Sequence, residues 1–390
     1  MKRTQLRQEN IKMRFEGIYK DWTAGRLSQA EAARILGVSD RTFRRYLGWY
    51  EQEGMEGLID RRIEQRSHLR APVDEVLALE EMYRGRFQGW NVKHFYSFYK
   101  QSGCRSYTWV KSRLQEARLV LKAPGKGKHR KQRERAPLIG MMIHQDASTH
   151  QWVPGQYWDL IVTMDDASNE HYSMFFVEQE GTVSSFLGIE EVIEKHGLFC
   201  SFYSDRGSHY WNTPVGGGKV DKLNLTQFGQ AMKRLGIEMI AAYSPEARGR
   251  SERMFRTHQD RLPKELALLG ITDMDSANRY LQEHYKPKFN EEFKVPPPAE
   301  GSAFVPLLTM DLKDILCEQF ERVVGKDNCV QFENLNLQIP ADNCRLHYVK
   351  AKVRVNRYPD GSLAIFYGPR KLASYSKTGL LKENRVMSAA

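Results

Sequence analysis

Three acidic residues lie on three separate predicted elements, and their side chains could share one task. Asp146 ends a short apolar run, Asp205 ends a second one, and Glu252 lies near the start of a long, basic, helix-like segment. Hard divalent cations prefer oxygen ligands, and two such cations can stabilise both the attacking and the leaving oxygen of a phosphodiester displacement. The residue types therefore favour metal-dependent phosphoryl transfer, if the fold brings the three carboxylates together.

Short apolar runs and helical segments alternate around these carboxylates in a defined order. Strand-like runs are predicted at 141–146, 158–164, 171–177, 198–204 and 237–242. Helical periodicity covers 183–196, 226–235 and a segment that begins near residue 248. The first three strands are close enough for an antiparallel meander, and the later ones alternate with helices as parallel crossovers do. A mixed five-stranded α/β sheet flanked by helices is expected.

Positive charge is concentrated in the first third of the chain. Residues 1–136 hold 30 Lys and Arg against 16 Asp and Glu, a balance of +14, whereas the remainder holds 29 against 32 and brings the total to +11. Such asymmetry is typical of a polyanion-binding region joined to a separate working domain. Charge that serves solubility alone is the other interpretation.

The segment 27–47 has the pattern of a helix-turn-helix. Ser28 and Glu31 have the spacing of a capping box, Gly37 can supply the turn, and Ser39 can cap a second helix. Ala32, Ile35, Leu36, Phe43 and Leu47 are expected to face inward. The outer face of the second helix, which would enter a major groove, carries Arg41, Thr42, Arg44 and Arg45. A simple helical hairpin is the alternative.

A weaker second copy of this pattern covers 72–118. Two helices are predicted at 73–83 and 92–99, and Ser106 can cap a third one that carries Lys111 and Arg113. Groove binding and a packing role are both open for this segment.

Residues 122–135 carry seven positive charges and almost no apolar side chains. This composition cannot form a core, but it can lie along phosphates with salt-dependent affinity. Candidate contacts are Lys126, Lys128, Arg130, Lys131, Arg133 and Arg135. A solvated tether is the alternative.

Other chemistries find little support in the sequence. The five cysteines are scattered and form no Cys-x-x-Cys pair, which argues against a disulfide framework and a zinc ribbon. No apolar stretch approaches the length of a membrane span, and no apolar segment follows the charged N-terminus. A cytoplasmic, nucleoid-associated bacterial protein without a membrane partner is expected.

The order of the motifs resembles the ribonuclease-H-like core of DDE transposases and integrases. The strings around the acidic residues are closer still to bacterial insertion-sequence transposases: His-Gln-Asp146-Ala-Ser, Met-Asp165-Asp166-Ala-Ser, Tyr-Ser-Asp205-Arg-Gly and Gly-Arg-Ser-Glu252-Arg. Upstream helix-turn-helix units and a basic linker are also usual in that group. The resemblance covers nearly the whole chain.

The resemblance implies that Asp146, Asp205 and Glu252 are the catalytic, metal-binding triad for two Mg²⁺ or Mn²⁺ ions. The Asp165-Asp166 pair is interpreted as a turn former, because the family does not usually count it among the ligands. Many relatives place a basic residue seven positions after the glutamate, where this chain has Gln259; Arg256 or Arg261 could take that DNA contact instead. Pro263 is expected to end or kink the helix.

The interval from Asp205 to Glu252 is 47 residues, longer than in the wider superfamily. The excess, placed at 206–223, is predicted to be an inserted surface loop. The C-terminal quarter has strand-like runs at 330–332, 337–339, 352–355 and 363–367, with the hairpin signal Asp360-Gly361 between the last two. The resemblance to phage Mu-type transposases implies a small β-barrel there, which could bind DNA or a second subunit.

The expected organisation follows from these segments. It comprises an all-α helix-turn-helix domain at 1–65, a second helix-turn-helix-like domain at 70–118, a basic linker at 119–136, the ribonuclease-H-like α/β domain at 137–300, a linker or helix at 301–327, an all-β barrel at 328–376 and a tail at 377–390.

The expected function is a DNA transposase that binds terminal repeats, hydrolyses the 3′ ends and joins them to target DNA. Double-stranded DNA and a homodimer or larger synaptic complex are the expected partners. Two alternatives remain open: a catalytically silent DNA-binding regulator, and a ribonuclease-H-type nuclease that acts on hybrids or junctions.

Overall fold

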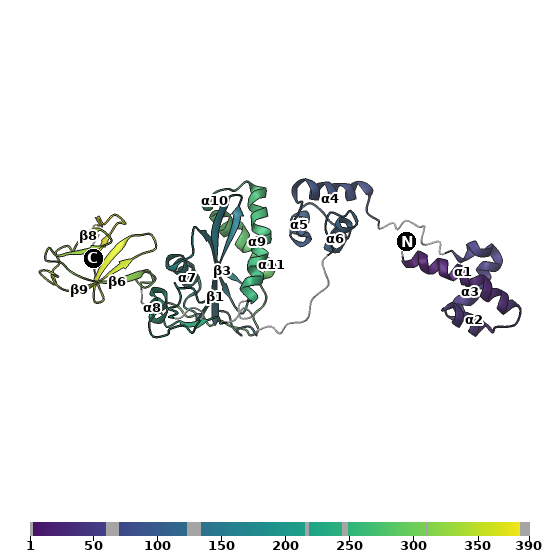
Figure 1. Cartoon of the computed structure of the whole chain (residues 1–390), viewed down its shortest axis with the longest axis horizontal. Coiled ribbons are helices and arrows are strands. Elements are labelled where there is room, and N and C mark those ends of the chain that lie inside the picture. Colours follow the sequence, from purple (N-terminus) through teal and green to yellow (C-terminus); the bar gives the residue numbers. More distant parts are fainter. Residues whose placement is uncertain are drawn as a thin grey trace. The chain divides into compact units, whose positions relative to one another are not determined.

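The computed structural model describes residues 3–59, 70–122, 134–214, 218–243, 249–308 and 311–382. Its contacts divide the chain into two compact units, Met1–Glu81 and Met82–Ala390 (Figure 1). Within the described ranges, no helix combines the length and apolar character that a membrane crossing requires.

The first unit is built around a helix-turn-helix. Its elements are α1 (Arg3–Thr23), α2 (Gln29–Leu36), α3 (Asp40–Glu53) and the 3₁₀ turn η1 (Gly54–Leu58). Both halves of the predicted capping box are present at Ser28 and Glu31, and Gly37 ends α2 with a φ of +76°. Left-handed backbone of this kind favours glycine because it has no Cβ. The predicted caps and turn are confirmed.

The inward face of α2 differs from the prediction at one position. Ala32, Ala33 and Leu36 are buried against Phe43, whereas Ile35 is exposed. Ala33 and Ile35 lie on opposite flanks of the line through Ala32 and Leu36, and it is the Ala33 flank that packs against the core.

Three further helices precede the sheet: α4 (Val73–Arg86), α5 (Val92–Tyr99) and α6 (Tyr107–Glu116). The predicted helix at 92–99 and the Ser106 cap are confirmed, since the Ser106 hydroxyl accepts from the Trp109 amide. Val110 and Leu114 are the buried residues of α6.

Helix α5 contacts a helix of the sheet domain, α9 (Gly249–Leu269), through polar groups. His94 Nε2 lies 2.6 Å from Glu265 Oε1, and both side chains are almost fully buried. The Tyr280 hydroxyl donates to the other oxygen of Glu265, and Asn91 donates to Asp260. The second helical segment therefore packs with the sheet domain, within the unit 82–390.

The central sheet has the strand order β3-β2-β1-β4-β5. Its strands are β1 (Met142–Val153), β2 (Gln156–Asp165), β3 (His171–Val177), β4 (Ser201–Ser204) and β5 (Glu238–Ala241). The first three form an antiparallel meander, and β4 and β5 pair in parallel with β1 and β4 respectively. All five predicted strands are confirmed, with the predicted directions.

Helices cover both faces of this sheet (Figure 1). One core lies under α7 (Thr182–His196) and α8 (Gln227–Arg234), and includes Ile143 and Phe202. The other lies under α9, α10 (Met274–Tyr280), the π-helical turn η4 (Leu281–Tyr285) and α11 (Lys286–Phe293), and includes Leu160 and Leu262. Because both faces are covered, β2 is apolar along most of its length rather than alternating.

Two expectations about this domain are corrected in part. Helix α9 does not end at Pro263 but continues to Leu269, because Leu262 and Leu266 pack fully into the second core. A kink at Pro263 stays a prediction. The inserted segment after Asp205 is not wholly a surface loop, because Tyr210, Trp211 and Val220 are buried in the first core. In both places tertiary burial overrides the local signal.

The C-terminal part is all β, as predicted. A five-stranded sheet has the order β12-β11-β10-β9-β6, and a separate hairpin pairs β7 with β8 around the same core. Their ranges are β6 (Glu318–Val323), β7 (Cys329–Phe332), β8 (Leu335–Gln338), β9 (Lys352–Arg357), β10 (Leu363–Tyr367), β11 (Arg370–Tyr375) and β12 (Leu381–Lys382).

Three of these strands were not predicted. Strand β6 lies in the segment expected to be linker or helix, and β11 lies in the expected barrel beyond its last predicted run. Strand β12 pairs with β11 and lies in the segment expected to be a tail. Strand β6 is also where this sheet joins the α/β domain, since Gln227 of α8 exchanges two hydrogen bonds with the backbone of Gln319. The predicted Asp360-Gly361 turn is confirmed, with Gly361 at a φ of +80°.

Candidate active site

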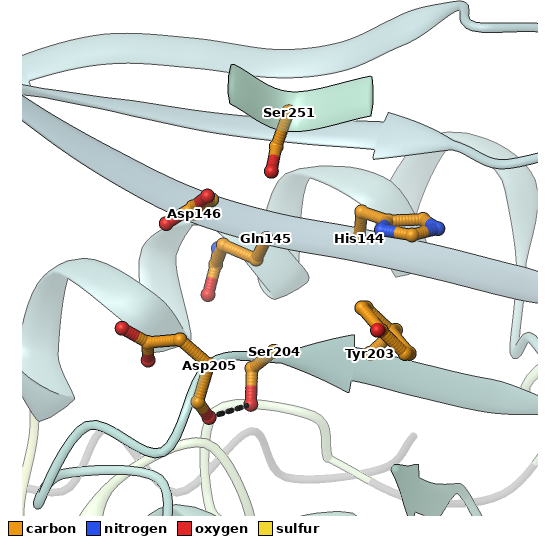
Figure 2. A pocket seen from close by; sticks show the side chains of 7 residues that line it. All are labelled: His144, Gln145, Asp146, Tyr203, Ser204, Asp205 and Ser251. Atoms are coloured by element: carbon orange, nitrogen blue, oxygen red, sulfur yellow. Dashed lines mark hydrogen bonds between the residues drawn. The ribbon is translucent and has the colours of Figure 1, made fainter. Parts of the chain in front are cut away.

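Two of the three candidate carboxylates meet where β1 and β4 end their pairing. These strands are parallel, with Ile143 opposite Phe202 and His144 opposite Tyr203. Asp146 and Asp205 each lie two residues further along, so a shared register sets them at corresponding positions on neighbouring strands. Both line one pocket, with His144, Gln145, Tyr203, Ser204 and Ser251. Figure 2 shows the two carboxylates on the same side of the strands.

Backbone amides one or two residues further along the chain orient these carboxylates. Asp205 Oδ1 accepts from the Gly207 amide at 2.9 Å, and the Ser204 hydroxyl donates to the Asp205 carbonyl. Asp146 Oδ1 accepts from the Ala147 amide at 3.0 Å. Each carboxylate is partly exposed, so oxygen atoms face a pocket that solvent can enter.

A buried polar network supports the floor of the pocket. Gln145 is buried, accepts from the Tyr210 hydroxyl at 2.9 Å and donates to Thr163 Oγ1 at 2.9 Å. Burial raises the pKa of Tyr210 well above its ordinary value, and the charges of Glu180, Asp146 and Asp205 add to this. The phenol therefore stays neutral and holds its hydrogen bond.

The segment after Asp205 builds this floor, a role that sequence reasoning missed. Tyr210 reaches Gln145, while the Trp211 indole donates to Ser204 Oγ at 3.1 Å. A signal was available, because two adjacent aromatic residues in a polar, glycine-rich stretch are unusual for a surface loop.

Glu252 is placed differently from the two aspartates. It lies in the first turn of α9 and is exposed, whereas its neighbour Ser251 lines the pocket. Across the ranges that the structure describes, no group of three His, Cys, Asp or Glu side chains is arranged to hold a metal ion. Convergence of all three carboxylates stays a prediction.

The Asp165-Asp166 pair divides into two roles. Asp165 accepts from the Gly140 amide, the Ser168 amide and the Ser168 hydroxyl, which is the turn-forming role expected of it, and burial raises its pKa. Asp166 accepts instead from His144 Nε2 at 2.8 Å, the Ala136 amide at 2.7 Å and Arg250 Nη1.

The ionisation of Asp166 follows from these partners. Burial alone would raise the pKa of this carboxyl, but the hydrogen bond and charge of His144, with the Ala136 amide and Arg250, outweigh it and lower the pKa. Asp166 is therefore a charged carboxylate, and it is held next to His144 of strand β1. No local pattern predicted the Arg250 partner, which lies 84 residues away in the chain.

Within the first unit, the candidate DNA contacts lie on α3. Arg41, Arg44 and Arg45 are exposed, and Arg45 stacks over the Trp49 ring at 4.8 Å. Thr42 also serves the helix cap, since its hydroxyl lies 2.9 Å from Ser39 Oγ.

The other candidate contacts are more varied. Lys111 is half-buried, Arg113 pairs with Glu116 at 2.8 Å, and Arg256 is exposed. Arg135 donates to the Asp166 carbonyl and to Asn169 Oδ1. Lys126, Lys128, Arg130, Lys131 and Arg133 lie outside the described residues.

Arg261, the second candidate on α9, is buried and does not face solvent. Its guanidinium forms two hydrogen bonds with Glu292, at 2.7 and 3.1 Å. Of the two arginines considered on this helix, only Arg256 offers an exposed cation.

The strand order, its mixed directions and its two helical layers define a ribonuclease-H-like core, carried with helix-turn-helix helices and an all-β C-terminal sheet. A helix-turn-helix domain family matches residues 20–66, which include α2 and α3.

Two relatives in sequence are named as transposases, which confirms the resemblance drawn from the motifs. The protein y4bF of Sinorhizobium fredii, named as a transposase, is 29% identical over 364 residues that cover 87% of this chain and 75% of the relative. The transposase for insertion sequence IS1202 of Streptococcus pneumoniae is 29% identical over 243 residues, 59% of this chain and half of the relative's length.

Solved structures similar to the chain include retroviral integrases. A simian T-cell lymphotropic virus intasome in complex with a PP2A regulatory subunit matches 69% of this chain and 91% of its own, with 15% identity and a TM-score of 0.33. The HTLV-2 integrase catalytic core in complex with magnesium matches 36% of this chain and 83% of its own, with 15% identity and a TM-score of 0.28.

Proposed function

We propose that this chain is a metal-dependent DNA transposase. It would bind the terminal repeats of a mobile element, hydrolyse the phosphodiester at each 3′ end and join the freed 3′-hydroxyl to target DNA. The observation that carries the proposal is that Asp146 and Asp205 line one pocket, just beyond the paired part of the neighbouring parallel strands β1 and β4. Transposase relatives over most of the chain support it.

The donor set of the pocket fits a hard divalent cation. Two carboxylates, the Gln145 amide and the hydroxyls of Ser204 and Ser251 are oxygen-bearing groups, and no cysteine lines the pocket. Asp146 and Asp205 would hold two Mg²⁺ or Mn²⁺ ions, with Glu252 completing the set from α9. Bound there, such ions would stabilise negative charge on the oxygens of the displaced phosphodiester.

The side chains around the pocket favour direct attack by water or a DNA hydroxyl over a covalent protein intermediate. Burial raises the pKa of Tyr210, and its hydroxyl donates a hydrogen bond to Gln145. Ser204 donates its hydroxyl to the Asp205 carbonyl. The role left to the chain is to orient the carboxylates and to place the DNA strand beside them.

DNA recognition would fall mainly to the basic N-terminal part. Arg41, Thr42, Arg44 and Arg45 on α3 would enter a major groove, and the linker cations would contact phosphates. Lys111, Arg113 and Arg256 would add contacts from the second unit. Because two ends must be processed together, we expect a homodimer or a larger assembly on paired ends.

The proposal is tested by incubating the full chain with duplexes that carry the terminal repeats flanking its own gene, with Mg²⁺ or EDTA, and mapping the 3′ ends. Cleavage and joining should occur only with the metal. Asp205→Asn should lower the rates of both reactions by more than roughly 100-fold, which is the upper range for a residue that only supports a metal ligand. The variant should still bind the ends. Joining that persists in Asp205→Asn would refute the assignment.

The same assay separates the alternatives. Cleavage of RNA–DNA hybrids in preference to duplex ends would indicate a ribonuclease-H-type nuclease. Specific binding of the ends without cleavage in any divalent metal would indicate a regulator.

The linker is tested separately by the salt dependence of end binding. Replacing Lys128, Arg130, Lys131 and Arg133 by Ala should lower the slope of log affinity against log salt by roughly 3 to 4, since each phosphate contact contributes about 0.9. An unchanged slope would remove the linker from the DNA interface.

A further inference from the structure

We infer that Asp166 is a positioning residue that holds the first turn of α9 against the carboxylate pocket. The inference rests on the proposed function and deepens it. It concerns the one candidate ligand, Glu252, that the sheet does not itself place.

The position of Asp166 makes it a junction between three segments. Its side chain is fully buried in the loop after β2. It accepts hydrogen bonds from His144 on the pocket strand β1, from the amide of Ala136 at the end of the linker, and from Arg250 in the first turn of α9. One carboxylate thus joins the pocket strand, the linker end and the glutamate helix.

The linker end has a second attachment at the same loop. Arg135 Nη1 donates to the Asp166 carbonyl at 3.0 Å, to the Ala167 carbonyl at 3.4 Å and to Asn169 Oδ1 at 2.8 Å. The chain that arrives from the DNA-binding part is therefore bound to the loop that carries Asp166, which places both attachments on one short turn.

The ion pair between Asp166 and Arg250 lies next to a residue that lines the pocket. Arg250 keeps only 20% of its side chain exposed, and the next residue, Ser251, lines the pocket. Glu252 follows Ser251 along the same helical turn. Because successive helical residues advance by only 1.5 Å, fixing Arg250 fixes the height at which Ser251 and Glu252 are presented.

The neighbouring Asp165 shows what a purely local role looks like. Among the residues that the structure describes, its side chain accepts hydrogen bonds from Gly140 and Ser168, both close to the same turn. Asp166 instead contacts groups 22, 30 and 84 residues away in sequence. The contrast within one dipeptide supports a positioning role for Asp166.

The experiment compares Asp166→Asn and Arg250→Gln with a matched control, Glu292→Gln. Glu292 pairs with Arg261 on the same helix α9, nearly three turns from the pocket, so its loss removes a similar ion pair elsewhere. With end DNA and Mg²⁺, both test variants should lower kcat by about 10–100-fold and leave KM for the ends nearly unchanged. Glu292→Gln should retain wild-type kcat.

A double variant tests whether the two groups act as a pair. If Asp166 acts through Arg250, then Asp166→Asn with Arg250→Gln should lose no more activity than the worse single variant. Losses that multiply would show independent roles and overturn the inference. If Asp166→Asn does not fold, Arg250→Gln decides the question through the kcat and exchange measurements. Arg250 is less buried than Asp166, so its replacement disturbs the fold less.

Hydrogen exchange gives a readout that does not depend on catalysis. Backbone amides at 251–256 should exchange faster in Asp166→Asn than in wild type, whereas those at 260–268 should not change. If both segments behave as in wild type, the inference is wrong even where cleavage is observed. If wild type shows no metal-dependent cleavage but the exchange result holds, the proposed function fails and the positioning role stands.

Discussion

The parallel strands β1 and β4 and the start of helix α9 hold their carboxylates in different ways. Asp146 and Asp205 follow residues in a parallel backbone ladder, where His144 lies opposite Tyr203. Glu252 lies in a helix turn that is attached to the sheet domain by side chains, notably the Arg250–Asp166 pair. The first arrangement is fixed by backbone hydrogen bonds, and the second by a buried salt bridge.

This difference predicts different sensitivities. A ladder tolerates changes of side chain because its bonds belong to the backbone. A buried ion pair depends on both partners, and removing one leaves a charge without compensation in a poorly solvated place. We therefore expect the geometry at Asp146 and Asp205 to be robust and the presentation of Glu252 to be adjustable by substitution.

The largest expected effect tests whether the exposed glutamate belongs to the site at all. Glu252→Gln should reduce metal-dependent joining more than 100-fold, as a lost ligand would, with end binding retained. Activity measured beside Asp205→Asn gives the comparison. A Glu252→Gln variant that joins DNA at near wild-type rate would show that the site consists of the strand-borne pair without the helix.

The next effect tests how tightly helix α7 packs against strands β1 and β2 beside the pocket. A Cβ on Gly188 of α7 would lie 2.2 Å from Gln145 Nε2 and 2.8 Å from Thr163 Oγ1. Gly188→Ala should therefore destabilise the fold by about 1–2 kcal/mol, because overpacking outweighs the gain in helix propensity. Gly229→Ala in α8, where the added atom meets ordinary contacts of 3.4 Å or more, is the control and should be neutral or stabilising. If Gly188→Ala and Gly229→Ala unfold at the same urea concentration, Gly188 is not tightly packed against Gln145 and Thr163.

A pH effect of similar size tests how the middle of α9 is held. His171 Nε2 lies 3.1 Å from His258 Nε2, and the Tyr285 hydroxyl lies 3.0 Å from His258 Nδ1. Burial lowers the pKa of His171 to about 4, and lowers that of His258 well below its usual range. Two neutral rings can satisfy this chain of hydrogen bonds.

The sign of the effect follows from these lowered values. Histidines of the unfolded chain have a pKa of roughly 6.5, so between about pH 6.5 and 4 they bind protons that the buried histidines of the folded chain do not bind. The stability of the fold is therefore full above about pH 6.5 and falls as the pH drops toward 4. His171 alone should cost about 2 kcal/mol between pH 7.5 and pH 5. Urea unfolding at both pH values measures it, and His171→Gln should flatten the dependence. Identical pH profiles would exclude this network.

The smallest effect concerns the exposed face of α9. Arg256→Ala should lower the salt slope of end binding by about 0.9, the contribution of one phosphate contact, and should leave the unfolding midpoint unchanged because the side chain is exposed. A slope equal to that of wild type would place this face of α9 away from DNA.

Much of the fold was readable from local pattern. The strand at 171–177 and the helix at 92–99 have the predicted bounds, and the caps at Ser28, Ser39 and Ser106 form as expected. These features depend on residues a few positions apart, whose periodicity and hydrogen-bonding groups are visible in the chain. Strand β6 escaped prediction because its burial is only partial and no regular alternation marks it.

By itself, then, the sequence determined the order of the elements, the positions of the carboxylates along them, and the resemblance that joins them. Only the tertiary structure decided that Tyr210 and Trp211 support the pocket, that Arg261 faces inward to Glu292, and that Asp166 bonds to Arg250. Local periodicity shows which side of an element is apolar. It does not show which distant side chain will meet a buried charge, since that partner is chosen by packing after the elements assemble.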